Sequence, residues 1–275
     1  PWLHSIKEIE TQKQILQKSI RLKEVENLID KVWLGKPFEA LAKPFLRPYK
    51  LSGENTTQKI KKIQKKLNLY EEQGFILTCP DSICWLANIR GEDVPNSPLM
   101  NCYAIVHHNH VCIYSMKDTY KDSARELRKN VVLKHFDVFF KDIKKLKKVL
   151  FEPTTTPFIL KKKIIGHSIK SEKVCNPVSL FKAKKNRIEL KGSIKSHEKD
   201  GVALLRFLRW FKSTKVNTLD EITLVKKLEQ FRKIDPSFYY NSFDTISAAG
   251  SNAAITHYRV SLKSNKKINP TDLIL

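Results

Sequence analysis

The chain lacks any long apolar run. It contains no stretch of about 18 consecutive apolar residues, the length that a membrane-spanning helix needs. Its first ten residues, PWLHSIKEIE, include Lys7, Glu8 and Glu10, so they do not form the apolar core of a signal peptide, and no initiator methionine precedes them. We therefore expect a cytoplasmic protein with no membrane partner.

Cysteine is also sparse, and its spacing matches no common metal motif. The five cysteines are odd in number, and only Cys79 and Cys84 are close together, with no second pair downstream. Structural zinc sites usually take two such pairs. We therefore expect reduced, buried thiols, as in an intracellular protein.

Arginine is scarce although the chain is strongly basic. The formal net charge is +23 at pH 7, but only ten of the 51 basic residues are arginine, and the lysines are spread along the whole sequence. Arginine is the residue that binds phosphates and guanine edges bidentately. This composition predicts weak, non-specific and salt-sensitive polyanion binding, and it does not support sequence-specific nucleic-acid recognition.

The sequence does contain an alternation of helix-like and strand-like segments. With 275 residues, 41% of them hydrophobic, it can bury the cores of two modest domains. Apolar spacing of three and four residues predicts helices, and short β-branched runs between turn residues predict strands. The expected helices are 5–33, 56–70 and 137–149, and the expected strands are 74–79, 103–106, 111–114, 149–153 and 157–160. The alternation over 50–178 predicts an α/β domain.

Segments that break regular structure divide the chain. Residues 35–53 carry three prolines between two glycines, which predicts an extended connector, and the CNP triplet at 175–177 marks a second boundary. We expect the end of a first domain plus the connector over 1–48, a second domain over 49–178 and a third over 179–275.

The third segment is expected to begin with helices. Apolar spacing predicts a helix over 193–211, with Trp210 and Phe211 in the core. Thr218 and Glu221 follow at the spacing of a capping box, which predicts a second helix start. The final residues, NPTDLIL, are typical of the start of a strand.

Four stretches resemble, in order, motifs of the three-domain Xaa-Pro aminopeptidases, the aminopeptidase P family. ENLIDKVW at 26–33 is similar to the end of that family's first domain, and DSICWLANIRGEDVPNSPL at 81–99 to its D-x-I-x-W-L-x-N-I-R-G-x-D signature. KAKKNRIELKGSIKSHEKDGVALLRFLRWF at 182–211 is similar to the helix that opens its catalytic domain, and SFDTISAAGSNAAITHY at 242–258 to its S-F-x-T-I-x-x-x-G-x-N-x-A-x-x-H-Y segment. The resemblance covers roughly residues 26–275.

The resemblance implies a fold class and a reaction. The fold class is α/β, with a creatinase-type N-terminal α/β domain followed by the incomplete start of a pita-bread (α+β) catalytic domain. Family members remove an N-terminal residue that precedes proline, with a water activated by two divalent ions, usually Mn²⁺. The implied substrate is a peptide with proline at its second position, and the implied assembly is a homodimer.

The same resemblance places the metal ligands outside this sequence. The family takes two Asp, one His and two Glu from segments after the H-Y pair, and the sequence ends at Leu275. Asp272 corresponds to the start of a strand, not to the ligand position that follows it. We therefore assign no metal ligand and no cofactor to this chain and expect no peptidase activity from it alone, because water without a bound metal is a poor nucleophile. A complementary C-terminal chain is the partner that turnover would need.

His257 is the only catalytic residue that the resemblance assigns. The family's H-Y histidine contacts the scissile peptide or shuttles a proton, and imidazole suits both tasks because it titrates near neutral pH. Gly250 can take a positive φ, and Ala253 replaces a glycine common in relatives. In a chain without metal ligands, we expect His257 to be a bystander.

Other polar groups have plainer interpretations. His107, His108 and His110 fall between two predicted strands with no carboxylate nearby in sequence, which predicts an exposed hairpin tip and not a metal site. Arg90 and Asp93 are expected to fix a turn through a salt link.

Three hypotheses about function stay open at this point. The first is a Xaa-Pro aminopeptidase-like protein that is inactive as this fragment. The second is a non-catalytic basic binding module. The third is the remnant of a split or degraded peptidase gene, and the sequence does not decide whether a C-terminal half exists elsewhere.

Overall fold

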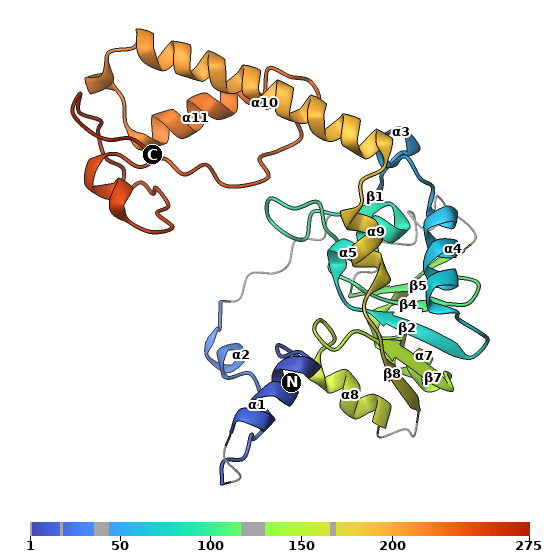
Figure 1. Cartoon of the computed structure of the whole chain (residues 1–275). Coiled ribbons are helices and arrows are strands. Elements are labelled where there is room, and N and C mark those ends of the chain that lie inside the picture. The colour runs from blue at the N-terminus through green and yellow to red at the C-terminus, as the bar shows by residue number, and fades with distance from the viewer. Residues whose placement is uncertain (1, 17–18, 36–43, 117–129, 166–168) are drawn as a thin grey trace. The chain divides into compact units, whose positions relative to one another are not determined.

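The structure, a computed structural model, describes residues 2–16, 19–35, 44–116, 130–165 and 169–275 (Figure 1). The chain divides into two compact units, Pro1–Ile188 and Glu189–Leu275. The domain boundaries expected at residues 48 and 178 stay predictions. Within the described ranges, no helix combines the length and the apolar content needed to cross a bilayer.

A six-stranded mixed sheet forms the centre of the first unit, in the order β6-β5-β4-β2-β7-β8. The strands are β2 (Gln73–Leu77), β4 (Tyr103–His107), β5 (Val111–Ser115), β6 (Val131–His135), β7 (Lys148–Phe151) and β8 (Lys170–Lys173). β4 pairs antiparallel with β2 and β5, whereas β5–β6, β2–β7 and β7–β8 are parallel. A second, two-stranded antiparallel sheet pairs β1 (Phe45–Leu46) with β3 (Ile89–Arg90).

Helices pack against both faces of the large sheet. The helices described in the first unit are α1 (Ile6–Ile15), α2 (Leu28–Val32), α3 (Tyr49–Ser52), α4 (Thr56–Leu67), α5 (Pro80–Ala87), α7 (Phe139–Lys144), α8 (Phe158–Ile165) and α9 (Pro177–Ala183), with a 3-10 turn, η1 (Phe136–Val138). One core cluster joins α4, α5 and α9 to the sheet, and the other joins α1, α7 and α8 to it. Apolar residues on both sides of β5 are buried, as expected for a strand covered on both faces. The predicted α/β fold class is confirmed.

The helix predicted over 5–33 is wrong in its middle part. α1 ends at Ile15 and α2 begins at Leu28, and no helix is assigned to residues 19–27. Ile20 and Val25 of that stretch are 53% and 60% exposed. A helix in a protein gains most of its stability from packing an apolar face against the core. The exposed side chains of Ile20 and Val25 do not supply such packing.

The strand predicted over 157–160 is also wrong, because residues 158–160 open helix α8 and Pro157 forms only an isolated bridge with Ser5. Leu160 and Ile164 lie four residues apart and are both buried in the second core cluster. That spacing puts them on one helical face. A short apolar run by itself does not distinguish the two structures.

The motif at 81–99 folds around a buried ammonium group. Lys59 of α4 is 1% exposed and donates to the carbonyl of Trp85 at 2.9 Å and to Oδ1 of Asn88 at 2.8 Å. Its Nζ lies 4.0 Å from the centroid of the Trp85 ring, a favourable cation–π position. Asn88 caps α5 in the left-handed conformation, with φ 53°. Lys59 therefore ties α4 to the end of α5.

Arg90 and Asp93 bind backbone groups around the following turn. Nη1 of Arg90 donates to the carbonyls of Cys84 and Ile89, both at 2.8 Å. Oδ2 of Asp93 accepts from the N–H of Asn101 at 2.8 Å. Both side chains thus bind backbone groups around the turn, and the salt link expected between them stays a prediction.

The second unit consists of two helices followed by a long irregular segment. The helices are α10 (Arg187–Ser213), which begins at the end of the first unit, and α11 (Glu221–Arg232), with 3-10 turns η2 (Val216–Thr218) and η3 (Gly250–Ala254). All residues of 189–275 are described, and none of them is in an extended strand. The terminal NPTDLIL segment pairs with Ala249 by an isolated antiparallel bridge at Ile274, so the predicted strand start is only a short pairing. Trp210 and Phe211 are partly buried against Leu219 and Leu224.

Candidate functional site

The start of α11 differs from the predicted capping box. Asp220 is the N-cap, and its carboxylate accepts from the N–H of Thr223 at 2.7 Å. Thr218 belongs to the preceding turn, where its hydroxyl donates to the carbonyl of Lys215. The capping box predicted for Thr218 and Glu221 is therefore wrong, and the carboxylate of Glu221 makes other contacts.

Glu221 organises the segment that resembles the family's H-Y motif. Its side chain is completely buried and accepts hydrogen bonds from the N–H of Ala249 at 2.7 Å, from the Tyr258 hydroxyl at 2.7 Å and from Nδ2 of Asn252 at 3.0 Å. The N–H of Lys266 adds a fourth donor at 3.1 Å. A buried carboxylate with this many donors is a fully satisfied polar centre.

The pKa of Glu221 reflects two opposed effects. Burial raises it, but the hydrogen bonds from Ala249, Tyr258, Asn252 and Lys266 outweigh burial and lower the pKa below the ordinary value of 4.5. Glu221 is therefore ionised at neutral pH, and its charge holds the two ends of the loop to α11.

Gly250 shapes the loop between these anchors. It has φ +53°, which the sequence allows, and its N–H donates to the carbonyl of Leu273 at 2.8 Å. A Cβ at this position would lie 2.6 Å from side-chain atoms of both Lys266 and Asp272. Glycine thus permits both the turn and the close approach of the terminal segment.

His257 is displayed on the surface of this anchored loop. It has a positive φ of 56°, a conformation that histidine adopts more readily than most residues. Its side chain is exposed, while the adjacent Tyr258 is only 7% exposed. The loop is therefore fixed from below by Tyr258 and presents the imidazole of His257 to solvent.

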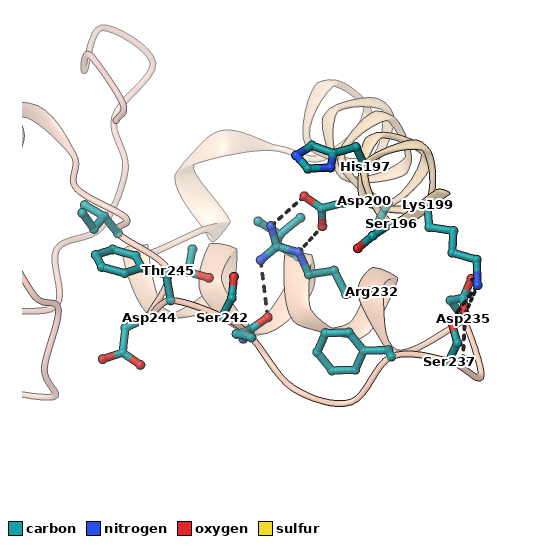
Figure 2. A pocket seen from close by; sticks show the side chains of 16 residues that line it. Ser196, His197, Lys199, Asp200, Arg232, Asp235, Ser237, Ser242, Asp244 and Thr245 are labelled. Atoms are coloured by element: carbon teal, nitrogen blue, oxygen red, sulfur yellow. Dashed lines mark hydrogen bonds and ion pairs between the residues drawn. The ribbon is translucent and has the colours of Figure 1, made fainter. Parts of the chain in front are cut away.

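A cavity of about 500 Å³ lies beside the start of the same segment, between α10, α11 and residues 241–246. Figure 2 shows Arg232 gripping Asp200 through Nε and Nη2, at 2.6 and 3.3 Å. Lys199 contacts Asp235 at 2.9 Å and the Ser237 hydroxyl at 2.6 Å. The cationic side chains of the cavity wall are therefore neutralised by neighbours, and the contacts tie α10 to α11.

The cavity and the His257 loop are distinct features. His197 lines the cavity, with Nδ1 placed 2.8 Å from the carbonyl of Ser193, whereas His257 is not among the lining residues. Hydrogen bonds from Ser237 and Lys199 lower the pKa of Asp235 to about 2, so this carboxylate is no proton donor near neutral pH. The ion pairs in the cavity wall connect α10 with α11, and the lining residues place no acid–base pair beside His257.

The key residue that sequence reasoning missed is Glu221. The capping-box prediction pairs the Glu221 carboxylate with a nearby backbone N–H. No local sequence pattern shows that Ala249 and Tyr258 are the partners of this carboxylate. The sequence feature that could have indicated such a residue is the presence of both Asn252 and Tyr258 in the H-Y motif. If these polar side chains are buried, they require a hydrogen-bonding partner.

Comparison with known proteins gives two family matches that together span most of the chain. The family model described as Creatinase/Prolidase N-terminal domain matches residues 35–189, and the model described as Metallopeptidase family M24 matches residues 193–275. With the fold above, these matches define a creatinase-type protein joined to the first part of an M24 metallopeptidase domain.

Individual relatives narrow the class further. A probable Xaa-Pro aminopeptidase P of Pyrenophora teres f. teres is 33% identical over 85% of this chain and 38% of the fungal protein, and one of Aspergillus niger is 33% identical over 91% and 43%. The chain thus spans about two fifths of the length of these curated relatives. The chain belongs to the Xaa-Pro aminopeptidase family, as its motifs predict.

Solved structures support the same assignment. The X-prolyl aminopeptidase from Caenorhabditis elegans, described as a cytosolic enzyme with a di-nuclear active site, has a TM-score of 0.76 and 25% identity over 90% of this chain and 42% of its own. The prolidase from Pyrococcus horikoshii has a TM-score of 0.57 and 19% identity over 80% of this chain and 58% of its own, a likeness of fold.

Proposed function

We propose that this chain serves in the removal of an N-terminal residue from peptides with proline at the second position. The observation that carries the proposal is the exposed His257 on a loop fixed by the buried Glu221, within the segment that matches the M24 family. The relatives named Xaa-Pro aminopeptidase P give the substrate class.

His257 is the residue of this chain that would act on the peptide. An imidazole can both donate and accept a proton, so this side chain can donate to the scissile carbonyl or carry a proton to the leaving amine. Tyr258 and Glu221 act as positioning residues, because their 2.7 Å hydrogen bond holds the backbone on which His257 stands.

The two-metal chemistry of complete family members needs ligands that the described residues do not bring together. The two ions would supply an activated water when bound. In the described part of the chain, the single convergent group of three His, Cys, Asp or Glu side chains is His107, His110 and Cys112, which contains no carboxylate. Hard cations such as Mn²⁺ take mainly oxygen ligands. The residues therefore do not fit the dinuclear site, and we expect no turnover from these 275 residues alone.

A chimeric enzyme tests the proposal directly. The part of the Aspergillus niger relative that lies beyond its match is appended after Leu275, and release of the first residue from an X-Pro-X peptide is measured with Mn²⁺. We expect the 275-residue chain to be inactive and the chimera to be active. His257→Asn should lower kcat/KM of the chimera by about 10²-fold or more, and Asn is chosen because it tolerates the positive φ of this position.

Matched controls separate chemistry from folding. His197→Asn changes another histidine of the same unit and should leave kcat/KM unchanged, and an X-Ala-X peptide should not be cleaved. Mn²⁺-dependent turnover by the 275 residues alone would refute the expected inactivity. Full activity of the His257→Asn chimera would refute the role of His257.

We further propose a cytoplasmic location and a homodimer. The cytosolic Caenorhabditis elegans relative supports the location, and free thiols at Cys79, Cys84, Cys102, Cys112 and Cys175 agree with a reducing compartment. Cell fractionation and light scattering test these points. The excess of lysine supports weak polyanion binding, which filter binding across a salt series would show as a steep loss of affinity.

A further inference from the structure

The β4–β5 hairpin brings two histidines and a cysteine together. The N–H of His107 donates to the carbonyl of His110 at 2.8 Å, and Cys112 pairs with Ile105. Because side chains alternate along a strand, His107 and Ile105 share a face, and Cys112 lies on that face too. The ligand atoms of His107, His110 and Cys112 all lie within 4.8 Å of one another.

Both imidazoles are ready to act as ligands. Both rings are half-buried and stacked on each other, and a neutral imidazole is the form that binds metals. Nδ1 of His110 lies 2.5 Å from Oδ1 of Asn109, which can only accept. That contact leaves Nε2 of His110 unprotonated, an arrangement common for metal-bound histidines.

Cys112 supplies the third donor. Its thiol is buried, and burial raises its pKa, whereas the nearby ammonium of Lys134 opposes that effect. Lys134 is itself held by Asp142 at 2.7 Å, and Asp142 also binds Lys145 at 2.9 Å. Asp142 thus offsets the charge of Lys134, the ammonium nearest to Cys112, while Lys145 is largely exposed to solvent.

We propose that His107, His110 and Cys112 form a binding site for a divalent cation of borderline softness, of which Zn²⁺ is the representative. Two nitrogens and one sulfur suit zinc, cobalt or nickel better than manganese or magnesium. The half-buried histidines leave the site open on one side, so a water completes the tetrahedron. On binding, the Cys112 S–H bond breaks, the sulfur bonds the metal and the proton leaves to solvent.

The geometry requires only side-chain movement. Nitrogen and sulfur ligands of a tetrahedral zinc lie roughly 3.3–3.6 Å apart, given metal–ligand distances of about 2.1 and 2.3 Å. The present limit of 4.8 Å is therefore about 1 Å too wide. The rings of His107 and His110 are stacked, with centroids 4.4 Å apart and planes at 10°. Binding would therefore require these two rings to rotate out of the stack.

Titration of the purified full chain with Co²⁺ tests the site. We expect one equivalent to give ligand-field bands of a four-coordinate ion and a thiolate-to-cobalt charge-transfer band in the near ultraviolet. Zn²⁺ should remove both, whereas Mn²⁺ should not. Cys112→Ala should abolish the charge-transfer band. His110→Gln, at a half-exposed turn position, should weaken binding by at least about tenfold without affecting the fold.

Matched controls lie in the same turn and at another thiol. His108→Gln changes the neighbouring histidine, and Cys175→Ser removes an exposed cysteine, so both variants should keep the wild-type spectrum. No charge-transfer band in the wild-type chain would overturn the proposal. So would a band that survives in both Cys112→Ala and His110→Gln, or one that is lost in Cys175→Ser.

Discussion

The hydroxyl of Tyr258 donates a 2.7 Å hydrogen bond to the carboxylate of Glu221, across 37 positions of sequence. The same hydroxyl lies 3.1 Å from the carbonyl of Ser264 and 2.9 Å from Nδ2 of Asn252. One phenol thus connects the first turn of α11 to both sides of the loop that carries His257. The position of His257 depends on these buried contacts.

Tyr258→Phe should weaken the second unit measurably. The change removes the hydroxyl and leaves the carboxylate of Glu221 with one donor fewer in a buried setting. Loss of a buried hydrogen bond to a charged group costs about 1.5–3 kcal/mol. Urea denaturation of the full chain should show a loss in this range, whereas Tyr239→Phe, at a site 60% exposed, should change little. Equal stabilities of the two variants would contradict the anchoring role.

The stability of the second unit should fall in acid because of Glu221. Its folded pKa lies below the ordinary value of 4.5, so the folded state binds its proton less tightly than the unfolded state does. The stabilisation is therefore complete above about pH 4.5 and is lost as the pH falls through the folded pKa. Glu221→Gln should lower stability at pH 7 and flatten the acid limb of the stability profile. Glu198→Gln, at an exposed position on α10, is the control and should preserve that limb.

Replacement of two glycines of the second unit by alanine should change its stability in opposite directions. Gly250 has φ +53°, a conformation that costs other residues roughly 1–2 kcal/mol, and Gly250→Ala should destabilise by about that amount. Gly192 lies within α10, where an added Cβ meets no atom within 4 Å. Gly192→Ala should therefore stabilise by about 0.5–1 kcal/mol. Thermal unfolding of both variants checks this pair, and a stabilising Gly250→Ala would contradict the backbone argument.

The buried ammonium of Lys59 should be important for the first unit. Lys59→Met fills much the same volume but leaves the carbonyl of Trp85 and Oδ1 of Asn88 without this donor. We expect a loss of about 2–3 kcal/mol, because unsatisfied buried acceptors are costly. Lys61→Met changes the exposed neighbour on α4 and should alter stability by less than about 0.5 kcal/mol. Chemical denaturation of both variants compares them, and a neutral Lys59→Met would show that packing alone holds α4 to α5.

Local sequence patterns correctly predict the helices and strands whose buried residues follow the expected periodicity. Phe75 and Ile76 in β2, and Ile60 and Ile63 in α4, are buried where sequence periodicity places them. The sequence predictions are wrong where tertiary contacts determine whether a segment is helical. Ile20 and Val25 keep helical spacing but remain exposed, whereas Leu160 and Ile164 belong to a helix because they enter a core built from distant strands. Periodicity reports which residues could share a face, and the tertiary partner determines whether that face forms.

The candidate site shows the same limit more sharply. The resemblance identifies His257 and the glycine at position 250 that can take a positive φ, both of which depend on local motif letters. It does not reveal Glu221, because the donors to that carboxylate come from Ala249, Tyr258 and Lys266, far away in sequence. The sequence also left Cys112 out of the His107–His110 group, since the hairpin register that joins them is a property of the folded sheet.

Adjacent positions 257 and 258 have opposite burial. The buried side chain of Tyr258 makes the hydrogen bonds that hold the loop, whereas the side chain of His257 is exposed to solvent. The side chain at position 257 can therefore be exchanged for another that accepts a positive φ, while the buried contacts of Tyr258 keep the loop in place.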